Sequence, residues 1–126
     1  MLRLSERFVT SDPLSKRDER KMVDHIGSLV DRYLAHIVAA GYDRVIGTSG
    51  TILSLGSVAA ALDSGAAPEE VRNLRVSAKA IRKVRKLVVD QPIARRLEIP
   101  ALDPRRADLV VAGAVLLDTL LRTLDA

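Results

Sequence analysis

The segment Val45-Ile46-Gly47-Thr48-Ser49-Gly50-Thr51-Ile52-Leu53 decides the fold that we expect for this chain. Two β-branched apolar residues lead into a turn of glycine and hydroxyl side chains, and an apolar segment, residues 52–62, follows. This order is typical of a strand, a tight turn and a helix. Gly47 and Gly50 can adopt backbone angles that are closed to other residues, and they let a ligand approach the main chain. A helix N-terminus adds unpaired N–H groups and partial positive charge, so the corner is suited to phosphate or ribose.

Two interpretations of this glycine corner, residues 47–51, remain open. Thr48, Ser49 and Thr51 add hydroxyl donors to a ligand site. Short turns rich in Gly, Ser and Thr are nevertheless common, so the five residues alone favour a plain strand-to-helix turn. The corner is not a Walker A loop, because the Lys and the longer glycine spacing are missing.

Length and composition predict one domain over residues 1–126. The chain is 48% hydrophobic but only 2% aromatic, so its core must be built from Leu, Val, Ile and Ala. The absence of Cys excludes a disulfide framework and Cys-ligated metal sites, and it suits a reducing compartment. The N-terminus lacks the apolar region of a signal peptide, and the longest apolar run, residues 109–117, is far short of the roughly 18 residues that span a membrane. We therefore expect a cytoplasmic protein that does not cross a membrane.

The net charge of +4 is distributed unevenly along the chain. A basic surface is suited to phosphates on a small ligand or on nucleic acid, although a solvated helix face is the plainer interpretation. With so few aromatic residues for base stacking, nucleic acid is the less favoured partner. The clustered basic residues are Lys79, Arg82, Lys83, Arg85, Lys86, Arg95, Arg96, Arg105 and Arg106.

The clearest helix is expected between Ser15, a good N-cap, and Gly41, a left-handed C-cap. Between these two caps, apolar residues recur every three or four positions from Met22 to Val38. His25 and His36 lie three turns apart on this helix, so they cannot share a metal, and we interpret both as surface or boundary residues.

The other expected elements follow from turn signals and apolar periodicity. They are a strand at residues 2–8, a strand at 42–46, a helix at 52–62, a helical turn at 69–74, a helix at 77–90 capped by Ser77, a short helix at 91–97 after Pro92, and a helix from 103 to 124.

The last of these helices begins with Asp103 as N-cap and Pro104 at its first position, and it is apolar nearly all round, so we expect it to be buried. Arg105 and Arg106 in its first turn oppose the helix dipole by about 0.3–1 kcal/mol. They form either a local ion-pair cluster with Asp103 and Asp108, or a group from which one arginine reaches an anion shared with the glycine corner.

Two segments together resemble a known family. The first segment is residues 47–51, Gly-Thr-Ser-Gly-Thr, and the second is residues 102–114, Leu-Asp-Pro-Arg-Arg-Ala-Asp-Leu-Val-Val-Ala-Gly-Ala. They look like the two C-terminal signatures of the exopolyphosphatase and guanosine pentaphosphate phosphohydrolase (Ppx/GppA) family, and they follow in the same order and at a similar separation. Residues 2–8 also resemble the strand after the family's central glycine motif, so the resemblance covers nearly the whole chain.

The resemblance implies a fold class: α/β, predominantly helical, and a partial ribonuclease-H-like half of the actin-like (sugar kinase and Hsp70-type) ATPase fold. It also implies hydrolysis of terminal phosphates from polyphosphate or guanosine pentaphosphate, with a divalent cation, which is expected to be magnesium in the full-length family. The family's Asp-x-Gly-(Thr/Ser)-Asn loop, Gly-Gly-Gly-Ser-Thr-Glu loop and catalytic Glu region have no counterpart in this chain. We therefore expect a second-half fragment with one wall of the ligand cleft, no catalytic or metal-binding residue, and no activity by itself.

The resemblance also implies site residues and partners. Gly47, Thr48, Ser49, Gly50 and Thr51 would line the side of the cleft that holds the nucleotide or the distal polyphosphate. Arg106 aligns with the Arg of the family's Arg-Ala-Asp motif and would contact the ligand, with Asp108 orienting it. The implied partners are polyphosphate or guanosine penta- or tetraphosphate and the missing N-terminal half of the enzyme.

Two other functions remain as alternatives. The chain is suited to an interaction module that forms a homodimer through its last helix or an unpaired sheet edge. It is also suited to a small basic domain that binds nucleic acid or other anions through residues 79–86.

Overall fold

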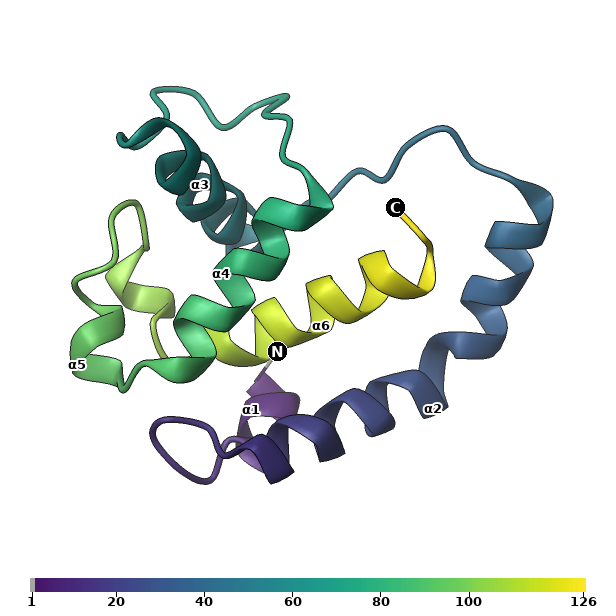
Figure 1. Ribbon diagram of the computed structural model, residues 1–126, viewed down its shortest axis with the longest axis horizontal. Helices are drawn as coiled ribbons and strands as arrows, with labels where there is room; N and C mark the ends of the chain where they lie inside the picture. The colour runs from purple at the N-terminus through teal and green to yellow at the C-terminus, as the bar shows by residue number, and fades with distance from the viewer. Residues whose placement is uncertain (1) are drawn as a thin grey trace.

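The computed structural model describes residues 2–126. Within that range the chain forms six α-helices and one short 3-10 helix, and it contains no strand (Figure 1). In chain order these are α1 (Leu2–Phe8), α2 (Lys16–Ala40), α3 (Gly50–Ser64), α4 (Ala78–Asp90), α5 (Ile93–Arg96), η1 (Pro104–Arg106) and α6 (Val110–Thr123).

Helix α6 lies at the centre of the structure. Figure 1 shows it between α4 on one side and α2 on the other, and it also contacts α3 and α1. Residues 110–115 are all buried, as expected for a helix that is apolar on nearly all sides. Leu55 and Val58 of α3 and Val84 and Val88 of α4 are fully buried in the same core.

The helix starts follow the capping signals of the sequence. The hydroxyl of Ser15 accepts a hydrogen bond from the backbone N–H of Asp18 at 3.1 Å, and that of Ser77 accepts one from Ala80 at 3.0 Å. Both predicted N-caps are confirmed. Gly41 ends α2 with a positive φ of 83°, but its ψ of 150° lies outside the left-handed helical region that we predicted.

The two predicted strands are wrong. Residues 2–8 form α1, in which Leu4 and Phe8 lie one turn apart and Phe8 is buried. Residues 42–46 are an exposed irregular segment that leads into α3. A strand needs a partner for its backbone groups, and within residues 2–126 neither segment has one, so the first satisfies its hydrogen bonds as a helix. The predominantly helical part of the expected fold class is confirmed.

The segment before α6 also differs from the prediction. Asp103 caps the 3-10 helix η1 by accepting from the backbone N–H of Arg105, and α6 starts only at Val110. The predicted helical turn at residues 69–74 is an irregular turn. The short helix after Pro92 is present as α5.

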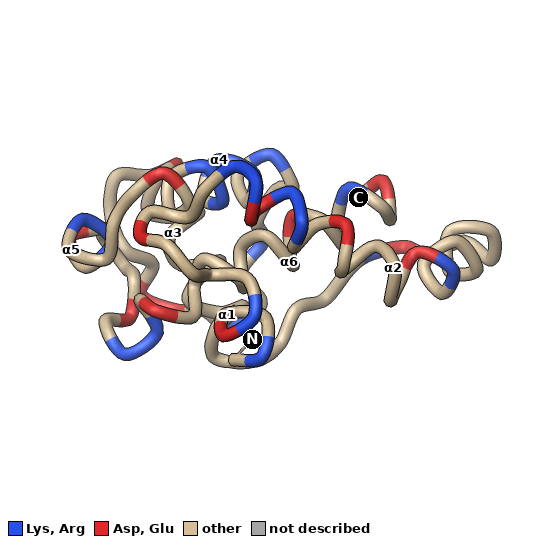
Figure 2. Tube along the Cα trace, turned by 90° about the horizontal axis from the view of Figure 1, so that it is seen from below, with Lys and Arg blue, Asp and Glu red and all other residues tan. Residues whose placement is uncertain are grey.

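Helix α2 packs into the core through its N-terminal part, as far as the half-buried Val30. Met22 and Ile26 are buried, whereas Leu29 and Tyr33 are 59% and 58% exposed although they continue the same apolar stripe. Figure 2 shows that the C-terminal part of α2 extends beyond the other helices. The periodicity therefore predicted the helix correctly, but not how much of its apolar face would be covered.

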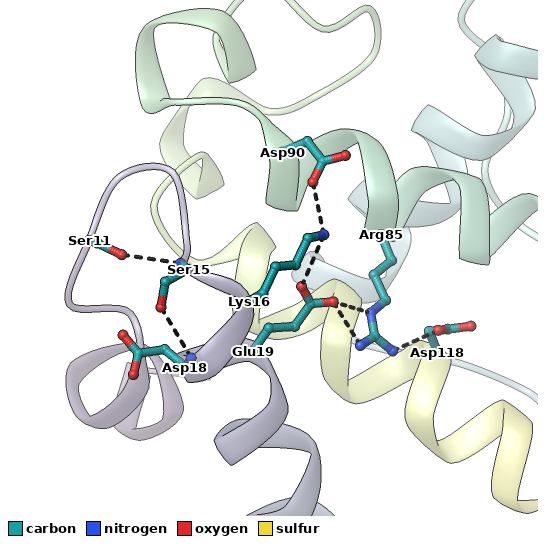
Figure 3. Close-up of polar contacts among 8 residues, drawn as sticks. All are labelled: Ser11, Ser15, Lys16, Asp18, Glu19, Arg85, Asp90 and Asp118. Atoms are coloured by element: carbon teal, nitrogen blue, oxygen red, sulfur yellow. Dashed lines mark hydrogen bonds and ion pairs between the residues drawn. The ribbon is translucent and has the colours of Figure 1, made fainter.

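A buried polar network joins α2, α4 and α6 (Figure 3). The guanidinium of Arg85 donates from Nη1 to Oδ2 of Asp118 at 2.8 Å and from Nη2 to Oε1 of Glu19 at 2.9 Å. The side chain of Asp118 is only 1% exposed. Arg85 is therefore largely covered by the neighbouring helices, whereas Lys79, Arg82, Lys83 and Lys86 form the solvated face of α4.

Candidate functional site

The glycine corner is an exposed segment that ends in the first turn of α3. Gly47, Thr48 and Ser49 are exposed, and the helix begins at Gly50. Ser49 caps it: its Oγ accepts from the backbone N–H of Ile52 at 3.5 Å. The φ of Ser49 is 91°, a region that strains a residue other than Gly by about 1–3 kcal/mol. The side chain of Thr51 is buried, so only Thr48 and Ser49 offer their hydroxyls at the surface.

Arg106 lies directly against this corner. An ideal Cβ built on Gly50 would be 2.8 Å from Nε of Arg106, and it would lie even closer to Cζ and Nη2. The guanidinium thus packs on the main chain at the first residue of α3. The structure therefore brings together the two segments, far apart in sequence, that were predicted to share an anion.

Asp103 is the carboxylate that accompanies Arg106. Its Oδ2 lies 3.9 Å from Nε of Arg106, and its two oxygens accept hydrogen bonds from the backbone N–H, Nε and Nη2 of Arg105 at 3.0–3.1 Å. The side-chain and backbone hydrogen bonds from Arg105 hold the pKa of Asp103 below its ordinary value, so the carboxylate is charged at neutral pH. Asp108, which we expected to orient Arg106, is exposed and forms no ion pair with it in the part of the chain that the structure describes.

The arginine pair divides into two different roles. Arg105 is satisfied by Asp103 although its side chain is 88% exposed, so it belongs to the local ion-pair cluster. The side chain of Arg106 is 37% exposed, and its guanidinium donates no hydrogen bond within residues 2–126; Asp103 approaches it only at 3.9 Å. Its guanidinium is therefore available to an anion at the corner.

Arg96 supports the site from the interior, a role that the sequence did not reveal. It is 4% exposed, and it donates from Nε to the carbonyl of Ala107 at 3.0 Å. It also donates from Nη1 to the carbonyl of Gln91 at 2.7 Å and to Oδ1 of Asp12 at 3.2 Å. No signal in the sequence separates it from the exposed Arg95 beside it.

A groove of about 1190 Å³ opens on one side of the glycine corner. Thr48 and Ser49 line it, together with residues 70–76 and the apolar side chains of Ile81, Leu117 and Leu121. Gly50 and Arg106 lie outside its lining, so the arginine contact and the groove are neighbouring features that meet at Ser49.

Neither a metal site nor a membrane span is visible in residues 2–126. No three or more His, Asp or Glu side chains in that range are grouped so that they could hold a metal ion. His25 packs against the ring of Phe8, with 5.2 Å between the ring centroids, and His36 is exposed. Among residues 2–126 no helix combines the length and the apolar composition of a membrane span.

The arrangement of these helices is that of a known fold. The crystal structure of the Aquifex aeolicus member of the Ppx/GppA protein family superposes on this chain with a TM-score of 0.77 at 18% sequence identity, covering 98% of this chain and 39% of that one. The sequence pattern of the Ppx/GppA phosphatase family matches residues 1–126. The chain belongs to the Ppx/GppA phosphatase family.

A curated relative carries a more specific name. Exopolyphosphatase 1 of Mycobacterium leprae (strain TN) is 28% identical over 124 residues, which are 98% of this chain and 36% of the relative. The chain thus spans well under half the length of both proteins.

Proposed function

We propose that this chain supplies one wall of the ligand cleft of a phosphatase that hydrolyses terminal phosphoanhydride bonds of polyphosphate or guanosine pentaphosphate. The observation that carries the proposal is the contact between Arg106 and Gly50: the guanidinium lies at the glycine corner, donates no side-chain hydrogen bond within residues 2–126 and has Asp103 only at 3.9 Å. The name of the Mycobacterium leprae relative supports polyphosphate as a substrate. In this proposal the helices belong to one ribonuclease-H-like half of an actin-like ATPase fold.

The chemistry assigns a limited part to this chain. Phosphoanhydride hydrolysis needs a positioned water, a general base and cationic groups on the phosphates. Arg106 can pair with phosphate oxygens, and the hydroxyls of Thr48 and Ser49 can donate to them. The family resemblance implies a divalent cation; within residues 2–126 no three ligating side chains lie together, so the proposal assigns no cation ligand to these residues. We therefore expect residues 1–126 alone to bind the anion without hydrolysing it.

A titration of the isotope-labelled chain with guanosine pentaphosphate and with short polyphosphate tests the proposal. We expect saturable shifts of the backbone amide signals of Gly47, Gly50 and Thr51. Arg106→Ala is expected to weaken binding about tenfold or more, because a charge-assisted hydrogen bond contributes about 1.5–3 kcal/mol. Arg95→Ala is the matched control: it removes the same charge from a side chain that is 69% exposed and, within residues 2–126, pairs only with Glu98, so affinity should change little.

Two results would contradict the proposal. The first is the absence of any saturable shift at residues 47–51. The second is a set of shifts confined to residues 79–86, which would indicate a diffuse anion surface on α4. In that case a steep decrease of affinity with salt, abolished by replacing Lys79, Lys83 and Lys86 with Ala, would favour the nucleic-acid alternative.

A further inference from the structure

We propose that Gly50 is a positioning residue, whose missing side chain provides the space in which the guanidinium of Arg106 lies. The inference rests on the proposed function, in which Arg106 contacts the phosphates. It assigns Gly50 a role different from the one that the sequence suggested, in which a glycine lets the ligand approach the main chain.

The backbone at position 50 does not itself require glycine. Gly41 and Gly65 have a positive φ, but Gly50 does not, and it lies inside α3. What distinguishes it is space, because a Cβ there would overlap three atoms of the Arg106 guanidinium. Gly56, one and a half turns further along the same helix, differs: a Cβ there would meet only Leu74 and Val76, at the ordinary contact distances of 3.9 and 4.0 Å.

The backbone on both sides of Arg106 is held in place. Before it, the N–H of Asp103 donates to Oγ of Ser54 on α3 at 3.3 Å. After it, Ala107 is buried, and its carbonyl accepts the hydrogen bond from Arg96. η1 therefore cannot easily move away from α3 to make room for a methyl group at position 50.

The overlap would instead be relieved by the Arg106 side chain. Its guanidinium is the flexible end of a long side chain and is already 37% exposed, so it can rotate into solvent. Gly50→Ala is therefore expected to leave the fold intact and to displace the guanidinium from the corner. The substitution leaves the net charge unchanged, so it tests the position of the cation separately from its presence.

The test is a double-mutant cycle on the full chain with inorganic triphosphate as the probe. The variants are Gly50→Ala, Arg106→Ala and their combination, with Gly56→Ala as the matched control. We expect Gly50→Ala to weaken triphosphate binding about as much as Arg106→Ala, roughly tenfold, and to weaken it no further in the Arg106→Ala background. Gly56→Ala should bind as the wild type does.

A measurement without ligand separates this inference from the proposed function. The Nε–Hε NMR signal of Arg106, assigned by its loss in Arg106→Ala, should shift in Gly50→Ala and stay in place in Gly56→Ala. If the wild type does not bind triphosphate at the corner, the proposed function fails, and this signal alone decides whether Gly50 positions Arg106.

Three results would overturn the inference. One is an unchanged Nε–Hε signal in Gly50→Ala. Another is an equal loss of affinity from Gly50→Ala with and without Arg106, which would mean that Gly50 meets the ligand directly and would leave the proposed function standing. The third is failure of both Gly50→Ala and the double variant to fold; folding of the double variant alone would support the inference.

Discussion

Replacing Asp118 with alanine is expected to lower the free energy of unfolding by about 3–5 kcal/mol, a large part of the roughly 5–15 kcal/mol that stabilises a domain. Asp118 is almost fully buried, and its oxygens lie 2.8 Å from Nη1 of Arg85 and 3.2 Å from Nε of Arg122. Arg82 approaches the same carboxylate at 3.8 Å. Without Asp118, Glu19 is the one ion-pair partner that Arg85 keeps within residues 2–126, although the Arg85 side chain is only 15% exposed.

Urea unfolding followed by circular dichroism would measure this loss. Asp63→Ala is a suitable control, because Asp63 is exposed in α3 and forms no ion pair within residues 2–126, so its loss should change the stability by less than about 0.5 kcal/mol. The effect of Asp118→Ala should persist at high salt, since a buried pair is screened little. A loss below about 1 kcal/mol would show that the carboxylate does not hold α2, α4 and α6 together.

The elements that sequence reasoning predicted correctly are those whose signals are local. Ser15 and Ser77 mark the starts of α2 and α4 because a cap needs only the next turn of the same helix. The even hydrophobicity of α6 predicted its burial for a similar reason: a helix without a polar face cannot lie on the surface.

The errors concern features that depend on distant parts of the chain. Residues 2–8 and 42–46 have the alternation and the β-branched residues of strands, but a strand is stable only with a partner, and local pattern does not reveal whether one is present. The burial of Leu29 and Tyr33 depends in the same way on what covers them, and among residues 2–126 no segment covers them fully.

The candidate site shows the same division. Its two halves, the glycine corner and Arg106, were identified from the family resemblance, and the structure places them in contact. The sequence did not identify which carboxylate lies beside Arg106, because Asp103 and Asp108 are both near it in the chain. The 3-10 geometry of η1 brings Asp103 closer. Whether these residues bind a ligand stays a prediction.

Replacing Arg96 with alanine is the second substitution with a large expected effect, a loss of about 3 kcal/mol in the free energy of unfolding. Arg96 is buried, and its guanidinium satisfies the carbonyls of Ala107 and Gln91 and pairs with Asp12. Its removal takes this donor from the carbonyls of Ala107 and Gln91 and opens a cavity next to η1, whereas Asp12 still accepts from the backbone N–H of Ile93. Arg96→Lys should recover only part of the loss, because an ammonium cannot donate in the fork geometry that reaches all three acceptors.

Thermal unfolding of Arg96→Ala and of Arg95→Ala separates the effect of burial from the effect of charge. Both substitutions remove one positive charge, but the side chain of Arg95 is 69% exposed. We expect Arg95→Ala to change the stability by less than about 0.5 kcal/mol. Arg96→Ala should in addition shift the Nε–Hε signal of Arg106, since the backbone after Arg106 is held through the carbonyl of Ala107. Equal effects of the two substitutions would contradict the role of Arg96 as the internal support of η1. A large loss of stability with an unchanged Arg106 signal would show that Arg96 stabilises the core but does not position Arg106.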